Sequence, residues 1–156
     1  MPAFQTLHPV HHKPKEMFDI VADVRAYPEF VPMCTGLYVR SEQERYGKKI
    51  LIADMSVGYK AVRETFTSQV ILDEEALEIK TKYLEGPFRY LHNDWRFLPS
   101  DITQDADYCD IDFSIDYEFR SKALGMLMGA MFNRAFSRFT AAFEARADAV
   151  YSTPAQ

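Results

Sequence analysis

The sequence predicts an α+β fold, in which a curved antiparallel sheet of about seven strands wraps around one long C-terminal helix. Two short helices are expected near the N-terminus. Three observations predict this class: a wide apolar face over residues 121–151, strict alternation over 108–119, and shorter alternating segments upstream. A sheet with one dry face must cover it, and only the segment 121–151 is long enough to do so.

The last predicted element is a single helix over residues 121–151. Its apolar residues recur at spacings of three and four, which at about 100° per residue spreads them over roughly half the helix circumference. Ser121 is suited to cap the N-terminus, and Pro154 lies just past the end. The apolar positions are Leu124, Leu127, Met128, Met131, Phe132, Ala135, Phe136, Phe139 and Phe143.

Two glycines, Gly125 and Gly129, interrupt this helix four residues apart. A glycine inside a helix costs about 0.5–1 kcal/mol relative to alanine. Either they allow a close approach of the backbone or form a soft spot where the helix can swing, or the helix merely tolerates them.

The segment before this helix, residues 108–119, alternates strictly between apolar and polar residues, as does an antiparallel strand with one dry and one wet face. The dry set is Cys109, Ile111, Phe113, Ile115, Tyr117 and Phe119, and the wet set is Tyr108, Asp110, Asp112, Ser114, Asp116 and Glu118.

The upstream segments supply the other elements. We expect a helix from Pro14 to about residue 24 and a helical turn or elbow at 27–32, where two prolines restrict the backbone. Strands are expected at 3–9, 37–45, 49–58, 60–72, around 77–83 and at 88–98, with turns between them. A single domain over residues 1–152 and a disordered tail at 153–156 complete this prediction.

Composition limits the function classes. The chain has 156 residues with a formal net charge of −5, and such an acidic protein is poorly suited to bind DNA along its phosphate backbone. Cys34, expected in an exposed loop, and Cys109 give no disulfide framework. No secretory stretch and no run of roughly 18 apolar residues is present. We expect a cytoplasmic protein that can visit the inner membrane peripherally.

Motifs for catalysis or cofactors are missing. The sequence contains no G-x-S-x-G elbow, no H-E-x-x-H and no glycine-rich phosphate loop. His8, His11 and His12 cluster, but without the cysteine or carboxylate and the fixed geometry that a metal site needs. We therefore expect neither an enzyme nor a resident metal or cofactor.

Six stretches, taken together and in order, resemble the helix-grip fold of START and Bet v 1-like domains. More narrowly, they resemble the ubiquinone-binding START group, also described as polyketide cyclase/dehydrase-like, which includes the ribosome-association toxin RatA. The resemblance implies a hydrophobic tunnel between the sheet and the last helix, which binds coenzyme Q or a related lipid to support respiration. The stretches are Tyr27–Cys34, Glu64–Val70, Gly86–Phe88, Leu91–Phe97, Asp112–Phe119 and Ala142–Ala147.

The candidate ligand site combines apolar residues of the predicted sheet and helix. Ligand cavities are mostly apolar, and methionine can repack around a flexible tail, although the same stripes are more often plain core. The sheet residues are Met55, Val57, Phe66, Trp95 and Phe97, and the helix residues are Leu124, Met128, Met131, Phe132 and Phe136.

The resemblance places residues 27–33 at the mouth of this tunnel. There Tyr27, Phe30, Val31 and Met33 could form a lid that dips into a bilayer. The alternative is a short helix packed on the edge of the sheet.

Glu64 is the odd polar residue on an otherwise apolar strand face. A buried carboxylate is costly unless it is paired. It could hydrogen-bond a quinone headgroup when protonated, pair with Arg89 or Arg96, or be exposed by strand twist.

Three functions remain open at this point. The first is a carrier or chaperone for ubiquinone or a related polyisoprenoid lipid. The second is a protein that associates with a ribosomal subunit, as toxins of the resembling group do. The third is a polyketide aromatase/cyclase, for which only Glu64 can be nominated as an acid or base.

Overall fold

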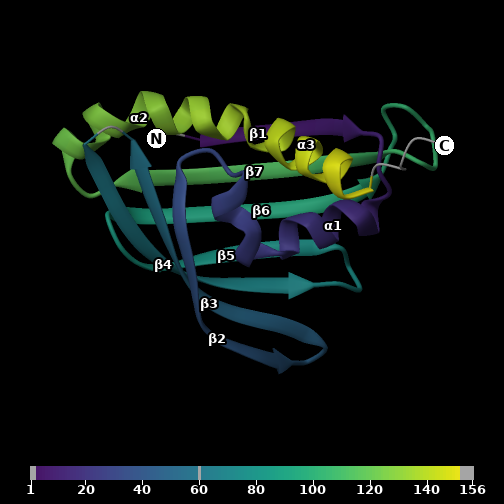
Figure 1. Ribbon diagram of the computed structural model, residues 1–156, viewed down its shortest axis with the longest axis horizontal. Helices are drawn as coiled ribbons and strands as arrows, with labels where there is room; N and C mark the ends of the chain where they lie inside the picture. The colour runs from purple at the N-terminus through teal and green to yellow at the C-terminus, as the bar shows by residue number, and fades with distance from the viewer. Residues whose placement is uncertain (1–2, 60, 152–156) are drawn as a thin grey trace.

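A seven-stranded antiparallel sheet forms the framework of the computed structural model, which describes residues 3–59 and 61–151 (Figure 1). The first strand pairs with the last, and the rest follow as hairpins, giving the order β1-β7-β6-β5-β4-β3-β2. This confirms the expected sheet, whereas the predicted tail at 153–156 lies outside the described residues. The strands are β1 (Ala3–Val10), β2 (Cys34–Arg45), β3 (Lys48–Tyr59), β4 (Val62–Asp73), β5 (Glu78–Glu85), β6 (Phe88–Pro99) and β7 (Cys109–Phe119).

The helices lie together on one side of this sheet (Figure 1). Between β1 and β2 the chain forms two short ones, α1 (Pro14–Ala22) and the 3-10 helix η1 (Val24–Glu29), as expected. After β7 it forms α2 (Lys122–Ser137) and α3 (Phe139–Tyr151). Within the described residues, no helix is both long enough and apolar enough to cross a membrane.

The prediction of one uninterrupted helix over 121–151 is wrong, because the chain breaks at Arg138. There the backbone reaches φ −104° and ψ −4°, and the Arg138 N–H bonds back to the Ala135 carbonyl at 3.0 Å. One residue earlier, the Ser137 hydroxyl donates to the Arg134 carbonyl of the preceding turn at 2.7 Å. Such side-chain bonds to the preceding turn bend helices, so the pair α2–α3 turns where a straight helix would continue.

The alternation in β7 is confirmed with one exception. All six residues of the predicted dry set are buried, but Asp110 of the wet set is only 2% exposed. Its carboxylate accepts hydrogen bonds from the Ser100 hydroxyl at 2.6 Å and from the Asp101 backbone N–H at 2.9 Å. Asp110 therefore anchors the loop between β6 and β7, a role that alternation alone does not reveal.

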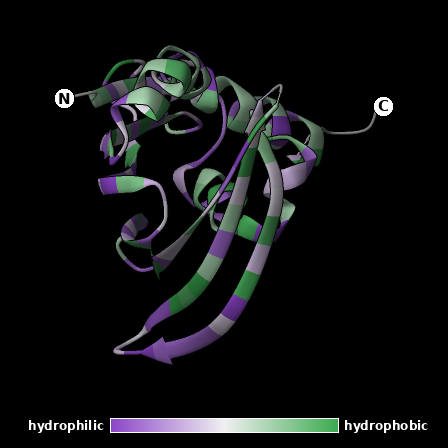
Figure 2. Ribbon diagram, turned by 90° about the vertical axis from the view of Figure 1, so that its left-hand side faces the viewer, coloured by the Kyte–Doolittle hydropathy of each residue, from purple (hydrophilic) through white to green (hydrophobic). Residues whose placement is uncertain are grey.

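The β2–β3 hairpin extends furthest from the helices (Figure 1). Its two turn residues, Tyr46 and Gly47, both have positive φ, 54° and 76°, as the two-residue turns that match strand twist require. Hydrophobic and hydrophilic segments alternate along its long strands (Figure 2). Cys34 begins β2 and is 7% exposed, so its expected exposure is wrong.

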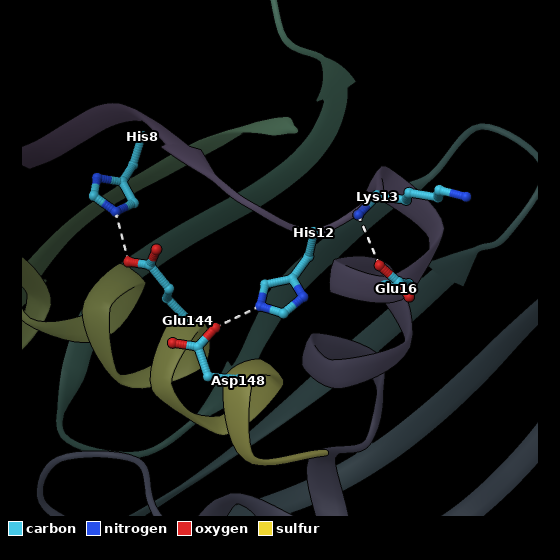
Figure 3. A network of polar contacts seen from close by, with 6 residues as sticks. All are labelled: His8, His12, Lys13, Glu16, Glu144 and Asp148. Atoms are coloured by element: carbon cyan, nitrogen blue, oxygen red, sulfur yellow. Dashed lines mark hydrogen bonds and ion pairs between the residues drawn. The ribbon is translucent and has the colours of Figure 1, made fainter. Parts of the chain in front are cut away.

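Two histidines join the first strand and the loop after it to the last helix (Figure 3). His8 Nε2 lies 3.1 Å from a carboxylate oxygen of Glu144, and His12 Nε2 lies 2.6 Å from one of Asp148. Because Glu144 and Asp148 are one turn apart on α3, the two pairs hold that helix along β1.

Candidate functional site

An apolar cavity of about 110 Å³ lies between the concave face of the sheet and the segments η1, α2 and α3. Its wall is built almost wholly from carbon-rich side chains. Among the described residues of the wall, the polar side chains are Tyr27, Ser68, Thr81 and Asn93. None of them carries a formal charge at neutral pH, so the cavity favours an uncharged, mostly apolar occupant.

The helix break shapes one side of this cavity. Ala135 and Phe136 come from the end of α2, and Phe139 and Phe143 from the start of α3, so the wall spans the break. The rings of Phe136 and Phe139 meet edge to face across it, with 5.1 Å between centroids. The bend at Arg138 therefore determines the position of this side of the cavity wall.

The sheet provides the opposite side in rows of paired residues. Leu37, Met55 and Phe66 lie side by side on β2, β3 and β4, and all three are half-buried. They form the more open end of the cavity. Further along the sheet, strand pairing aligns Thr81 of β5 with Asn93 of β6, and both are half-buried as well.

The segment after α1 closes a third side. The Tyr27 hydroxyl donates to the Val21 carbonyl at 2.5 Å, and burial raises the pKa of Tyr27 far above its ordinary value. Next to it, Phe30 packs edge to face on Phe143, with 5.1 Å between centroids, and the Arg146 guanidinium lies over the outer side of Phe30. This segment is thus packed against α3, and η1 also contacts the edge strand β2, as the alternative of a short helix on the edge of the sheet predicts.

The structure brings most of the predicted site residues to this cavity. Their role in ligand binding stays a prediction. Those in the wall are Tyr27, Val31, Met33, Met55, Val57, Phe66, Trp95, Phe132 and Phe136.

Other predicted site residues lie outside the wall. Phe97 is fully buried behind Trp95 and packs on Phe18 of α1. Met128 is fully buried, while Leu124 and Met131 are half-buried against the core. Like Phe30, these three residues belong to the core or pack against it without lining the cavity.

Glu64 also lies outside the wall and is half-buried. The two arginines proposed as its partners are paired elsewhere: Arg89 with Glu118 at 3.6 Å and Arg96 with Asp112 at 2.5 Å. Neither predicted ion pair forms, since β6 presents both arginines on the solvent face beside β7.

Sequence reasoning missed several wall residues. Ser68 shares the inward face of β4 with Phe66, and this could be read from the alternation, but its place beside the cavity depends on how β3 to β6 pair. Phe139 and Phe143 belonged to the apolar stripe but were not assigned to the site. The missed residues also include Val70, Ile79, Thr81, Leu91, Asn93, Ile115 and Ala135.

A protein-family model described as "Polyketide cyclase / dehydrase and lipid transport" matches residues 10–144. The chain belongs to this family. Membership agrees with the apolar cavity, and the protein is a START-like, lipid-binding member of the family.

Two curated relatives differ in how much of their length is matched. The ribosome association toxin RatA of Rickettsia prowazekii is 31% identical over 153 residues, which cover 96% of this chain and 99% of the toxin. The mitochondrial coenzyme Q-binding protein COQ10 homolog B of Xenopus laevis is 30% identical over 88% of this chain, but this covers only 54% of that protein.

Solved structures confirm the helix-grip architecture. The 18 kDa protein CC1736 from Caulobacter crescentus is 32% identical, with a TM-score of 0.78 and coverage of 98% of this chain and 100% of that one. A START superfamily protein from Mycobacterium smegmatis is 17% identical, with a TM-score of 0.76 and coverage of 95% and 98%. At that identity the likeness shows the fold alone.

Proposed function

We propose that this protein binds a polyisoprenoid quinone, ubiquinone or a close relative, and carries it in support of respiration. The observation that carries this proposal is the apolar cavity between the sheet and the broken helix, whose wall has no charged side chain among the described residues. The coenzyme Q-binding name of one relative supports the ligand class.

Binding requires the cavity to grow. Its volume of about 110 Å³ is below the ~300 Å³ or more that small-molecule sites usually have. Two features allow expansion: the break at Arg138, where α2 and α3 can move apart, and the flexible side chains of Met33 and Met55. Each methylene or equivalent apolar group that becomes buried then contributes about 0.8 kcal/mol.

Exchange with a membrane would use the outer face of α2. Met126 is 85% exposed and Leu127 is 63% exposed, although both are large apolar side chains. Exposed apolar side chains on one helix turn can insert among lipid acyl chains. We place the transient membrane contact here, because the segment at Tyr27 and Phe30, which the sequence offered as a possible membrane-dipping lid, packs inward.

The protein acts in this proposal as a carrier and not as an enzyme. Tyr27 is the one titratable side chain that the wall contains among the described residues, and its proton is donated to the Val21 carbonyl. A general acid or base needs a group that titrates near the working pH. Burial moves the pKa of Tyr27 away from that range.

The test is native mass spectrometry and organic extraction of protein purified from a quinone-producing host. We expect bound quinone in the wild type and its loss in Ala135→Phe, which fills the cavity from α2. The matched control is Ala130→Phe, which adds the same ring on the exposed side of the same helix. Circular dichroism and thermal melting show that each variant folds.

Two results would contradict the carrier function. One is a wild-type protein that is empty and takes up no added ubiquinone. The other is equal quinone content in Ala135→Phe and Ala130→Phe, which would place the ligand outside this cavity.

A second candidate function is association with a ribosomal subunit. The RatA relative is matched over 99% of its length, which favours keeping this alternative. On α2, which contains no acidic residue, Lys122 and Arg134 are exposed, as is Arg138 just after it. None of the three forms an ion pair with another described residue, so this face could contact RNA phosphates despite the acidic chain.

Salt-dependent co-sedimentation with purified ribosomal subunits tests this alternative. We expect binding that weakens as salt rises and is lost in Arg134→Glu/Arg138→Glu. Lys82→Glu, a charge reversal at an exposed position of β5, is the control and should bind as the wild type does. Binding that is unchanged both by salt and in the double variant would exclude this face as the contact with the ribosomal subunit.

A further inference from the structure

Ser68 holds a hydroxyl that the protein itself leaves without a partner. The residue is 5% exposed and lines the cavity, and among the described residues it carries the only fully buried side-chain polar atom without a hydrogen bond. Burying a hydroxyl in this state is unfavourable, because its hydrogen bonds to water are lost and not replaced. Such a cost in an apolar wall points to a group that arrives with the ligand.

Other polar side chains of the cavity wall lie near Ser68. A strand irregularity between Thr67 and Ser68 places Thr67 opposite Glu85 but Ser68 opposite Tyr83, which leaves one extra residue on β5. Irregularities of this kind re-aim side chains. Thr81 is then the diagonal neighbour of Ser68 across the two strands, on the same face.

Asn93 extends this polar region onto β6. It pairs directly with Thr81, and its side-chain Nδ2 donates to the Ser114 carbonyl of β7 at 2.9 Å. That bond fixes the amide, since only the NH₂ group can donate to a carbonyl. Ser68, Thr81 and Asn93 therefore form a short polar row, inside a wall that is otherwise apolar.

Burial differs along the inward face of β4. Ser68 and Val70 are buried, whereas Phe66, two residues earlier on the same face of β4, is half-buried. Met55 and Leu37, beside Phe66, are half-buried too. Ser68 thus lies deeper than the open, apolar end of the cavity, whereas its polar neighbours Thr81 and Asn93 are half-buried.

We infer that the ligand enters headgroup first, and that Ser68 Oγ donates a hydrogen bond to an oxygen of that headgroup. The inference rests on the proposed function and adds the site and the orientation of the ligand. A quinone ring carbonyl fits, because it accepts a hydrogen bond and carries no charge. Its isoprenoid tail then extends past Phe66 and Met55 toward the open end.

Ser68→Ala tests the anchor with decylubiquinone as the probe. We expect the Kd to rise about five- to tenfold, as for the loss of one hydrogen bond of about 1 kcal/mol. Ser56→Ala is the matched control: the Ser56 hydroxyl, one strand away, bonds to Thr65 outside the cavity, and its loss should leave the Kd unchanged. The Tm of ligand-free Ser68→Ala should equal or exceed that of the wild type, because no hydrogen bond is lost.

The outcomes separate this inference from the proposed function. If the wild type and Ser68→Ala bind decylubiquinone equally, the anchor is wrong and the carrier function stands. If Ser68→Ala lowers the Tm of the ligand-free protein, Ser68 is structural and the anchor is wrong again. If the wild type binds no quinone, both the proposed function and the Ser68 anchor are wrong.

A ubiquinone analogue with an azide on its ring tests the orientation. After illumination and trypsin digestion, fragment sequencing of the peptide between Arg63 and Lys80 should place the label at Ser68 or Val70 and not at Phe66, which lies on the same peptide but at the open end. Labelling of residues 26–40 instead, where Met33 and Leu37 line the open end, would overturn headgroup-first entry.

Discussion

The ring of Phe143 on α3 meets the indole of Trp95 on β6 edge to face, with 5.0 Å between ring centroids. Both side chains are almost fully buried, at 1% and 4% exposure, and both line the cavity. This contact joins the second half of the broken helix to the sheet. Since Trp95 is the single tryptophan of the sequence, its fluorescence reports directly on the cavity.

Phe143→Ala should lower the free energy of unfolding by about 3–5 kcal/mol, because a buried ring is lost and a void remains. Urea unfolding followed by Trp95 fluorescence measures this change. Val150→Ala, at a position of the same helix that is 53% exposed, should cost far less. Equal costs in the two variants would show that α3 is not held by this contact.

Gly129→Ala should raise the free energy of unfolding by about 0.5–1 kcal/mol. Gly129 lies inside α2, and a Cβ built there meets no atom within 4 Å outside its own helix. Thermal melting checks the gain. If the variant is more stable but exchanges quinone more slowly, Gly129 is the soft spot considered from the sequence, whereas a loss of stability would contradict the open space around it.

Gly86→Ala should destabilise the protein by more than about 1 kcal/mol. Gly86 has φ +146°, and a Cβ there would come within 2.5 Å of the Phe66 Cβ. Phe66 lines the open end of the cavity, so this variant should also alter quinone uptake. Gly47→Ala, at φ +76° with nothing within 4 Å, separates backbone strain from the clash and should cost less.

Neither thiol should react with iodoacetamide at pH 8 in the folded protein. Burial raises the pKa of the Cys109 thiol to about 12 and raises that of Cys34 as well. The thiolate is the reactive form, so both should alkylate only after urea unfolds the chain. Mass spectrometry counts the labels, and rapid labelling of native Cys34 would contradict its burial at the start of β2.

Stability should fall in acid partly through Asp54. The Thr67 hydroxyl donates to this carboxylate at 2.5 Å and the Arg40 guanidinium at 2.8 Å, and they hold the pKa of Asp54 below its ordinary value. A carboxyl whose pKa is lower in the folded state contributes stability above its unfolded pKa of about 4 and loses it as the pH falls through its folded pKa.

Urea unfolding of wild type and Asp54→Asn at pH 7 and pH 3 measures this effect. The variant should be less stable at pH 7 and closer to the wild type at pH 3. Glu44→Gln, at an exposed position of β2, should show the pH dependence of the wild type. An Asp54→Asn variant that keeps the full difference at pH 3 would exclude this carboxyl as its source.

The sequence predicts some residues of the cavity wall correctly and others not, for physical reasons that differ between residues. Phe132 and Phe136 could be placed correctly because helical periodicity fixes which face they share. Met128 and Leu124 share that stripe, yet they lie beside the cavity, because a stripe half the helix wide faces more than one neighbour. Opposite charge alone suggests an ion pair between Glu64 and Arg89 or Arg96. In the structure, strand pairing places both arginines beside other carboxylates.

By itself, the sequence determined the strands, their dry faces and the apolar character of the last helical segment, because these depend on local periodicity and turn residues. The tertiary structure alone decided the break at Arg138, the burial of Asp110 and the unpartnered hydroxyl of Ser68. The burial of Asp110 and the unpartnered hydroxyl of Ser68 depend on how the strands pair, which joins residues that no short sequence pattern connects. The break at Arg138 involves the local bond from Ser137 to Arg134, which helical periodicity does not reveal.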